Sequence, residues 1–157
     1  MGKKLVAYFS ASGTTARVAE SLAAATGADV FRIEPAKPYT SADLNWRDSH
    51  SRTSREMGDD GARPALAQVP GDVSGYDTVF VGFPIWWHVE PRIVDTFLES
   101  CDLSGATIAP FATSGGSGLG RAPERMQAIA TGARVLPGKV LNGNPSAAAL
   151  RSWAEGL

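Results

Sequence analysis

The sequence predicts an α/β fold in which five parallel strands form one doubly wound sheet with helices on both faces. Two observations support this prediction. Strand-like and helix-like segments alternate along the chain, and the segment Thr78–Phe83 contains only valine, phenylalanine and glycine after its first residue. Alternation is typical of βαβ units, and a continuously apolar strand is expected where helices cover both faces of a parallel sheet. The expected architecture therefore has three layers, with the sheet between two layers of helices.

Two strands and the helix between them are predicted at the start of the chain. Leu5–Phe9 is an apolar run, and Thr15–Thr26 repeats apolar residues at helical spacing up to Gly27, a typical helix terminator. Asp29–Glu34 is the second predicted strand and is closed by Pro35. Such a unit is expected to form a parallel strand pair.

The later elements continue the alternation. Thr78–Phe83, rich in valine and phenylalanine, is the third predicted strand. Pro91 opens a helix whose apolar stripe includes Cys101, which we interpret as a buried structural thiol. Two strands and two helices complete the prediction: Thr107–Thr113, Arg134–Leu136, Pro123–Ala130 and a helix capped by Ser146.

The segment from Pro38 to Gly75 interrupts this alternation. It has little apolar periodicity and mixes both charge signs. A short helix over Ser41–Met57, anchored by Leu44 and Trp46, is predicted within it. Connections of this length are uncommon in compact domains and are often functional. A solvated excursion of the chain is the alternative that stays open.

The composition is that of an ordinary globular chain. Its 157 residues are 43% hydrophobic and 20% charged, which fits a single domain over residues 1–157. The formal net charge of −1 gives no electrostatic footprint for nucleic acid, and no apolar run has the length that a bilayer requires. We therefore expect neither nucleic acid nor a membrane among the partners.

Targeting features favour a cytoplasmic location. Met1-Gly2-Lys3-Lys4 resembles the basic start of a signal peptide, but the five apolar residues after it are too few for the segment that must follow. Cys101 is the single cysteine, which excludes an internal disulfide and fits a reducing compartment. We expect the protein to be cytoplasmic.

The loop after the first predicted strand, Ser10-Ala11-Ser12-Gly13-Thr14-Thr15, predicts an anion site. It leads directly into a helix, whose first backbone N–H groups have no partner within the helix. Four hydroxyl groups add donors, and Gly13 lets the backbone approach a ligand closely. A phosphate is the favoured occupant, and an ordinary helix cap is the alternative. No Gly-Lys-Ser/Thr follows, so the loop is not a Walker A motif, and it suits a tightly held cofactor better than a Mg-nucleotide substrate.

Two further loops after predicted strands have unusual compositions. Pro84-Ile85-Trp86-Trp87 places two tryptophans just past a strand end, where one indole can pack inward while the other faces a ligand. Thr113-Ser114-Gly115-Gly116-Ser117-Gly118 offers almost bare backbone, which can approach a flat ring and donate N–H groups to its edge. The alternatives are a buried tryptophan pair and a flexible glycine turn.

Parallel sheets bind ligands outside the carboxyl ends of their strands, where these three loops are expected to meet. Hydroxyl groups, aromatic rings and bare backbone together indicate a site for a phosphorylated planar ring. This pattern assigns no metal ligand and no catalytic side chain.

The titratable residues near these loops give no catalytic constellation. A serine hydrolase would need a histidine and an acid beside Ser114 or Ser117, and the chain contains only His50 and His88. His88 and Glu90 follow the tryptophans, and we interpret His88 as a partly exposed polar residue. Donation from His88 to a ligand is the alternative.

These motifs resemble those of the flavodoxin-like family, whose cofactor is FMN. The first loop has the hydroxyl-x-hydroxyl-Gly-x-Thr form of that family's phosphate loop. The other two are similar to the ring-flanking loops of its single-domain branch, and the resemblance covers nearly the whole chain. It implies phosphate binding by Ser10, Ser12, Thr14 and Thr15. It also implies an isoalloxazine bordered by Pro84 to Trp87 and by Ser114 to Gly118.

The resemblance implies electron transfer through noncovalently bound FMN. One interpretation is an electron carrier that docks with a redox partner protein. The alternative is an NAD(P)H-dependent FMN reductase of quinones or other small-molecule electron acceptors, with residues 38–75 shaping a pocket. The near-neutral charge weakens the first interpretation, because acidic residues around the flavin would steer a carrier toward a basic partner. No nicotinamide-binding motif supports the second, and the carrier is preferred on the resemblance.

Overall fold

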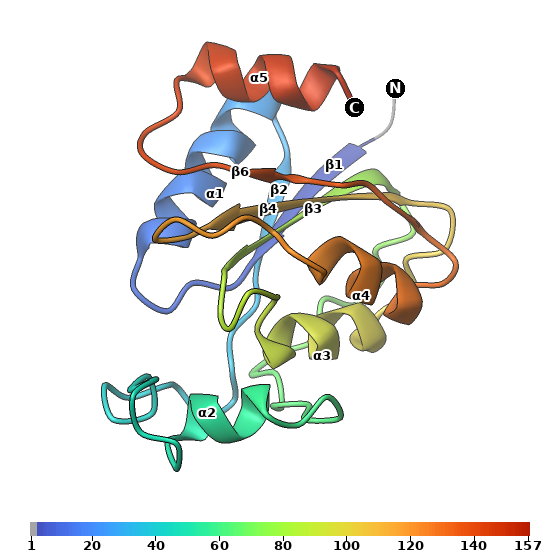
Figure 1. Cartoon of the computed structure of the whole chain (residues 1–157). Helices are drawn as coiled ribbons and strands as arrows, with labels where there is room; N and C mark the ends of the chain where they lie inside the picture. The colour runs from blue at the N-terminus through green and yellow to red at the C-terminus, as the bar shows by residue number, and fades with distance from the viewer. Residues whose placement is uncertain (1–2) are drawn as a thin grey trace.

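A computed structural model describes residues 3–157 (Figure 1), so the first two residues of the basic start considered above lie outside the described residues. The strands are β1 Lys3–Tyr8, β2 Asp29–Arg32, β3 Tyr76–Pro84, β4 Thr107–Thr113, β5 Arg134–Val135 and β6 Lys139–Val140. The helices are α1 Thr14–Thr26, α2 Arg52–Met57, α3 Arg92–Ser100, α4 Ala122–Ile129 and α5 Ala147–Glu155.

The strands form one parallel sheet in the order β2-β1-β3-β4-β5. This arrangement confirms the predicted doubly wound sheet. A sixth strand, β6, was not predicted, and it pairs with β4 at Phe111 and Ala112. Its two residues are too few to show any periodicity in the sequence.

Helices cover both faces of the sheet, as predicted (Figure 1). Helices α1 and α5 pack on one face, and α3 and α4 pack on the other. The side chains of β1 alternate between the two cores: Leu5 and Ala7 face α3 and α4, whereas Val6 and Tyr8 face α1 and α5. None of the helices within residues 3–157 has the length and apolar character needed to span a membrane.

Residues 79–83 of the central strand β3 are buried, which explains why this part of the strand has no polar side chain. Gly82 lies opposite Phe111 of β4, and a Cβ atom at Gly82 would lie 2.1 Å from that ring. The aromatic ring of Phe111 therefore occupies the space above a residue that has no side chain.

The predicted helix Ser41–Met57 is wrong in its extent, because only α2 is helical within this range. Trp46 is 67% exposed, so it does not anchor the segment. Leu44 is half-buried, and its backbone N–H donates to the carbonyl of Thr40 at 3.1 Å.

Polar side chains explain why the residues before α2 form turns. The side-chain oxygen of Asn45 accepts the N–H of Arg47 at 3.2 Å, and that of Asp48 accepts the N–H of His50 at 2.9 Å. Such local bonds compete with the helical ladder. The helix consequently starts later, at Ser51, whose side chain caps it.

The segment after α2 returns along the end of β2. Pro35 and Leu66 form an antiparallel bridge, and the N–H of Ala36 donates to the carbonyl of Ala65 at 2.8 Å. The chain before α2 and the chain after it therefore meet beside the carboxyl end of β2.

Candidate functional site

The three loops singled out by the sequence lie together at one end of the sheet. They are loop 1 (Ser10–Thr15), loop 2 (Pro84–His88) and loop 3 (Thr113–Gly118). They begin at or follow the ends of β1, β3 and β4, which are neighbours in the sheet. A hydrogen bond of 2.7 Å joins the hydroxyls of Thr15 and Thr113, and the N–H of Ile85 donates to the carbonyl of Thr113 at 3.0 Å. The structure therefore brings the predicted site residues to one place.

The hydroxyls of loop 1 have different environments. The oxygen of Ser10 accepts the N–H groups of Gly13 and Ala16, each at 3.1 Å, so this side chain caps the start of α1. Ser12 and Thr14 are exposed, and their hydroxyls lie 3.4 Å apart. Helix capping and an open hydroxyl surface therefore coexist in one loop.

The backbone of loop 1 favours an anion at the start of α1. Gly13 takes a φ of 92°, in the left-handed region that suits glycine. The N–H groups of Thr14 and Thr15 lie in the first turn, where no earlier helical carbonyl is available to them. That turn ends with Arg17 and has no acidic residue, so the helix dipole and the local charge both favour a negative group.

Loop 2 contains a tight turn that the sequence did not reveal. Trp86 and Val89 exchange backbone hydrogen bonds of 3.0 and 3.1 Å across it. The central residues, Trp87 and His88, have φ values of 49° and 67°. This geometry resembles a primed hairpin turn, which usually requires Asn-Gly or Gly at these positions. Two bulky residues with positive φ place strain directly at the candidate site.

The two tryptophans point in different directions, as predicted for adjacent residues. The indole of Trp86 packs edge-on against the rings of Phe9 and Tyr39, with 5.5 Å between ring centroids in both pairs. Trp87 is 44% exposed. Trp86 is thus part of an aromatic cluster, and Trp87 is the indole that is free to contact a ligand.

Loop 3 is held in shape by its own serine. The hydroxyl of Ser114 donates to the carbonyl of Ser117 and accepts the N–H of Gly116 at 3.2 Å. Gly116 has a φ of 146°, which disfavours any residue with a side chain. The glycines of this loop have open space around them. The loop therefore exposes its backbone groups to a possible ligand.

Two residues that sequence reasoning missed support loop 3. The side-chain oxygen of Asn142, two residues beyond β6, accepts the N–H of Ser114 at 2.9 Å. Gly120 has a φ of 55°, and a Cβ atom there would lie 2.4 Å from the carbonyl oxygen of His88. Bare backbone at Gly120 therefore lets the chain leaving loop 3 pass against loop 2.

The long connection reaches the site through Tyr39. Its hydroxyl donates to Glu56 at 2.6 Å, and the guanidinium of Arg52 lies 3.9 Å from its ring centroid. Arg52 also pairs with Glu56 at 2.9 Å. Burial, reinforced by the hydrogen bond to Glu56, raises the pKa of Tyr39. Tyr39 is therefore fixed by α2 while its ring supports Trp86.

Arg92 fastens α2 to the body of the protein. This guanidinium is only 3% exposed and donates to the carbonyls of Glu56, Met57 and Asp59 at 3.0 to 3.3 Å. It also donates to the carboxylate of Asp60 at 3.0 Å. A solvated excursion is therefore the wrong description of this part of the segment.

Two fully buried carboxyls, Glu90 and Asp95, lie beside this attachment. Glu90 follows loop 2 and faces Arg125 at 3.4 Å, while one oxygen of Asp95 lies 3.7 Å from Arg125. Burial, with the negative charge of Asp95, raises the pKa of Glu90 to about 9. The burial of Glu90 therefore favours its protonated form. Its burial was not evident from a single acidic residue in the sequence.

The remaining titratable residues near the loops form no further constellation. His88 is exposed, as its simpler interpretation predicted. Cys101 is half-buried rather than buried, and burial raises the pKa of its thiol. Within residues 3–157, no three His, Cys, Asp or Glu side chains are grouped so that they could hold a metal ion.

The sheet order and the three loops at its carboxyl edge define a flavodoxin-like protein. A family model described as flavodoxin matches residues 3–157, and the chain belongs to the flavodoxin family. A comparison with curated proteins found no match.

Solved structures include two close relatives. A protein from Bacteroides uniformis described as a flavoprotein is 48% identical, with a TM-score of 0.92 and 98% of each chain covered. One from Bacteroides eggerthii with the same description is 47% identical, with a TM-score of 0.94, and the match covers 99% of this chain and 98% of that one. A Lactobacillus acidophilus flavoprotein, solved in complex with FMN, shares 19% identity and a TM-score of 0.64 over 89% of this chain and 93% of its own. At that identity the likeness shows the fold alone.

Proposed function

We propose that this protein binds one FMN noncovalently and transfers electrons through it. The observation that carries the proposal is the meeting of loops 1, 2 and 3 at one edge of the sheet, joined by the bond between Thr15 and Thr113. Membership of the flavodoxin family supports a flavin, and the FMN complex of the similarly folded L. acidophilus protein supports FMN.

Loop 1 is the proposed phosphate site. The exposed hydroxyls of Ser12 and Thr14 and the first N–H groups of α1 donate to the phosphate. Ser10 orients these groups by capping the helix, and Thr15 ties the loop to β4. Ala11 and Gly13 contribute exposed backbone at this turn.

Loops 2 and 3 are the proposed borders of the isoalloxazine. Trp87 contacts the ring face, and the backbone N–H groups of Gly115, Gly116 and Gly118 face its polar edge. The remaining members hold these groups in position: Pro84, Ile85, Trp86, Thr113, Ser114 and Ser117.

FMN supplies the electron chemistry when it is bound, and the protein supplies binding, orientation and shielding from water. In this proposal the protein is a single domain over residues 1–157 and is located in the cytoplasm. It passes electrons to a redox partner protein.

Reduction of a small-molecule acceptor with NAD(P)H is the second candidate function. It is favoured by Tyr39, which brings the segment 38–75 into contact with Trp86 of loop 2. A rigid neighbouring segment can shape a pocket at a flavin, whereas a carrier gains from an open flavin edge.

A titration of apoprotein with FMN and with riboflavin tests the cofactor assignment. We expect FMN to bind more tightly, because riboflavin lacks the phosphate that loop 1 is proposed to hold. Ser12→Ala combined with Thr14→Val should weaken FMN binding and leave riboflavin binding unchanged. Equal affinities of the unmodified protein for the two flavins would overturn the assignment. Turnover of NADH or NADPH with a quinone then separates the two candidate functions, since a pure carrier shows none.

A further inference from the structure

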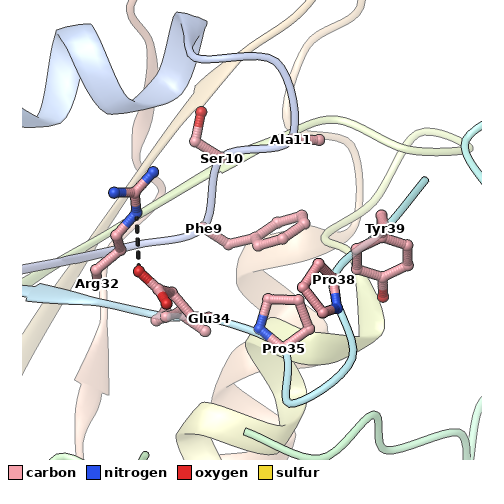
Figure 2. Close-up of a pocket in the computed structure, with 9 residues that line it drawn as sticks. Phe9, Ser10, Ala11, Arg32, Glu34, Pro35, Pro38 and Tyr39 are labelled. Carbon is pink, nitrogen blue, oxygen red and sulfur yellow. Dashed lines mark ion pairs between the residues drawn. The ribbon is translucent and has the colours of Figure 1, made fainter. Parts of the chain in front are cut away.

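A cavity of about 320 Å³ lies at the carboxyl ends of β1 and β2 (Figure 2). It meets loop 1 at Ser10 and Ala11. Strand β2 lies on the opposite side of β1 from β3 and β4, so β1 separates the cavity from loop 3. Two of its lining residues, Phe9 and Tyr39, contact Trp86 of loop 2. Its volume suits a single small ring system, such as a nucleobase.

One wall of the cavity is aromatic and rigid. Figure 2 shows Phe9, Pro38 and Tyr39 on one side of it, with Pro35 below them. Tyr39 is held by its hydrogen bond of 2.6 Å to Glu56, so its ring is already ordered before any ligand arrives. Rigid aromatic and proline surfaces bind a planar ring at a small entropic penalty.

The opposite wall is an ion pair. Arg32 and Glu34 approach each other at 3.3 Å between Nε and Oε1, and their side chains are 58% and 50% exposed. This contact uses one N–H of a guanidinium that has five and one oxygen of a carboxylate that has two. Donors and an acceptor therefore remain side by side at the cavity wall. An exposed pair of this kind adds little to stability, so folding does not account for it.

A ring that carries an acceptor next to an amino group matches this wall. The acceptor receives an N–H from Arg32, and the amino group donates to the carboxylate of Glu34. Both the carboxamide of nicotinamide and the N1–N6 edge of adenine have this pattern. Because the ion pair is neutral as a whole, it selects by hydrogen-bond pattern and not by net charge.

We propose that this cavity binds the adenine or nicotinamide ring of a nucleotide, packed against Tyr39, Pro35 and Pro38 and hydrogen-bonded to Arg32 and Glu34. The site meets the proposed flavin-binding groups at loop 1 and at Trp86 of loop 2, which packs against Phe9 and Tyr39. The proposal goes beyond the proposed function, because binding in the cavity does not depend on which acceptor receives the electrons.

Calorimetric titration of the flavin-loaded protein with adenosine and with nicotinamide tests the proposal. Both probes lack a phosphate, so neither competes for the phosphate site of loop 1. Binding of one probe identifies the ring that the cavity takes. Arg32→Met and Glu34→Gln should each weaken that binding about tenfold, the usual effect of one hydrogen bond to a charged group. Arg151→Met on α5 is the matched control and should bind like the unmodified protein.

Three results would overturn the proposal: no binding of either probe at millimolar concentration, equal binding by all variants, or loss of the flavin from both cavity variants. The last would mean that the cavity is part of the flavin site. Flavin content is measured by absorbance in every sample, so failure of the flavin assignment is seen separately.

Discussion

Replacement of Glu90 by glutamine tests whether the buried carboxyl beside loop 2 is protonated. Glu90 is fully buried, and burial together with the charge of Asp95 raises its pKa from 4.5 to about 9. Between these two values the folded protein holds a proton that the unfolded chain has released. Glutamine resembles the protonated acid in shape and offers both a donor and an acceptor, so Glu90→Gln should fold normally.

The size of the effect follows from proton linkage. A group whose pKa is raised on folding stabilises the protein fully below its unfolded pKa, and this stability is lost as pH rises toward the folded pKa. For one proton the slope is about 1.4 kcal/mol per pH unit. Between pH 5.5 and 7.5 the unmodified protein should therefore lose about 3 kcal/mol that Glu90→Gln does not lose. The stability of Glu90→Gln relative to the unmodified protein should therefore increase with rising pH.

Urea unfolding at these two pH values measures the difference in the free energy of unfolding between the two proteins. Glu124→Gln is the control, because Glu124 forms an exposed pair with Arg121 and its loss should change stability by less than about 1 kcal/mol at either pH. A difference between Glu90→Gln and the unmodified protein that stays constant with pH would refute the reasoning. It would mean that Arg125, at 3.4 Å, keeps Glu90 ionised in spite of its burial.

Further substitutions test the roles given to the tryptophans and to Gly82. Trp87→Ala should weaken FMN binding by about 1–3 kcal/mol in a fluorescence titration, whereas Trp153→Ala on α5 should not; equal effects would exclude Trp87 from the site. Trp86→Ala should instead lower the free energy of unfolding by about 1–3 kcal/mol, because it removes a half-buried indole from the aromatic cluster. Gly82→Ala should cost about 1–3 kcal/mol of stability, since its Cβ would lie 2.1 Å from the ring of Phe111; a stability equal to that of the unmodified protein would contradict this packing.

Local sequence signals predicted the frame of the fold and the place of the loops. Thr78–Phe83 was recognisable because residues 79–83 have no polar side chain, as expected where a parallel strand is buried on both faces. Thr15–Thr26 was recognisable because its apolar face repeats with the helical period and Gly27 ends it. The three loops followed from the strand ends, since parallel strands place their carboxyl ends at one edge.

Features that depend on distant residues were not predictable in this way. Asn142 supports loop 3 from beyond a strand of only two residues, which has no readable periodicity. The turn at Trp87 and His88 lacks the glycine or asparagine that usually marks it, so no residue type in the sequence indicates it. Burial of Glu90 depends on how α3 and α4 pack, and this packing cannot be inferred from one acidic residue in the sequence.

The attachment of the long segment bears on how it can act. Tyr39 packs against Trp86 near its start, and Arg92 binds the carbonyls at the end of α2. Lifting α2 away would break these hydrogen bonds to a charged group, each of which contributes about 1.5–3 kcal/mol. An opening of that cost is rarely populated, since about 1.4 kcal/mol corresponds to each tenfold change in population. The segment therefore behaves as a fixed wall beside loop 2 and not as a lid. If the protein reduces small molecules, this wall selects them by the shape of a preformed pocket, and closure of the segment over a substrate has no part in the reaction.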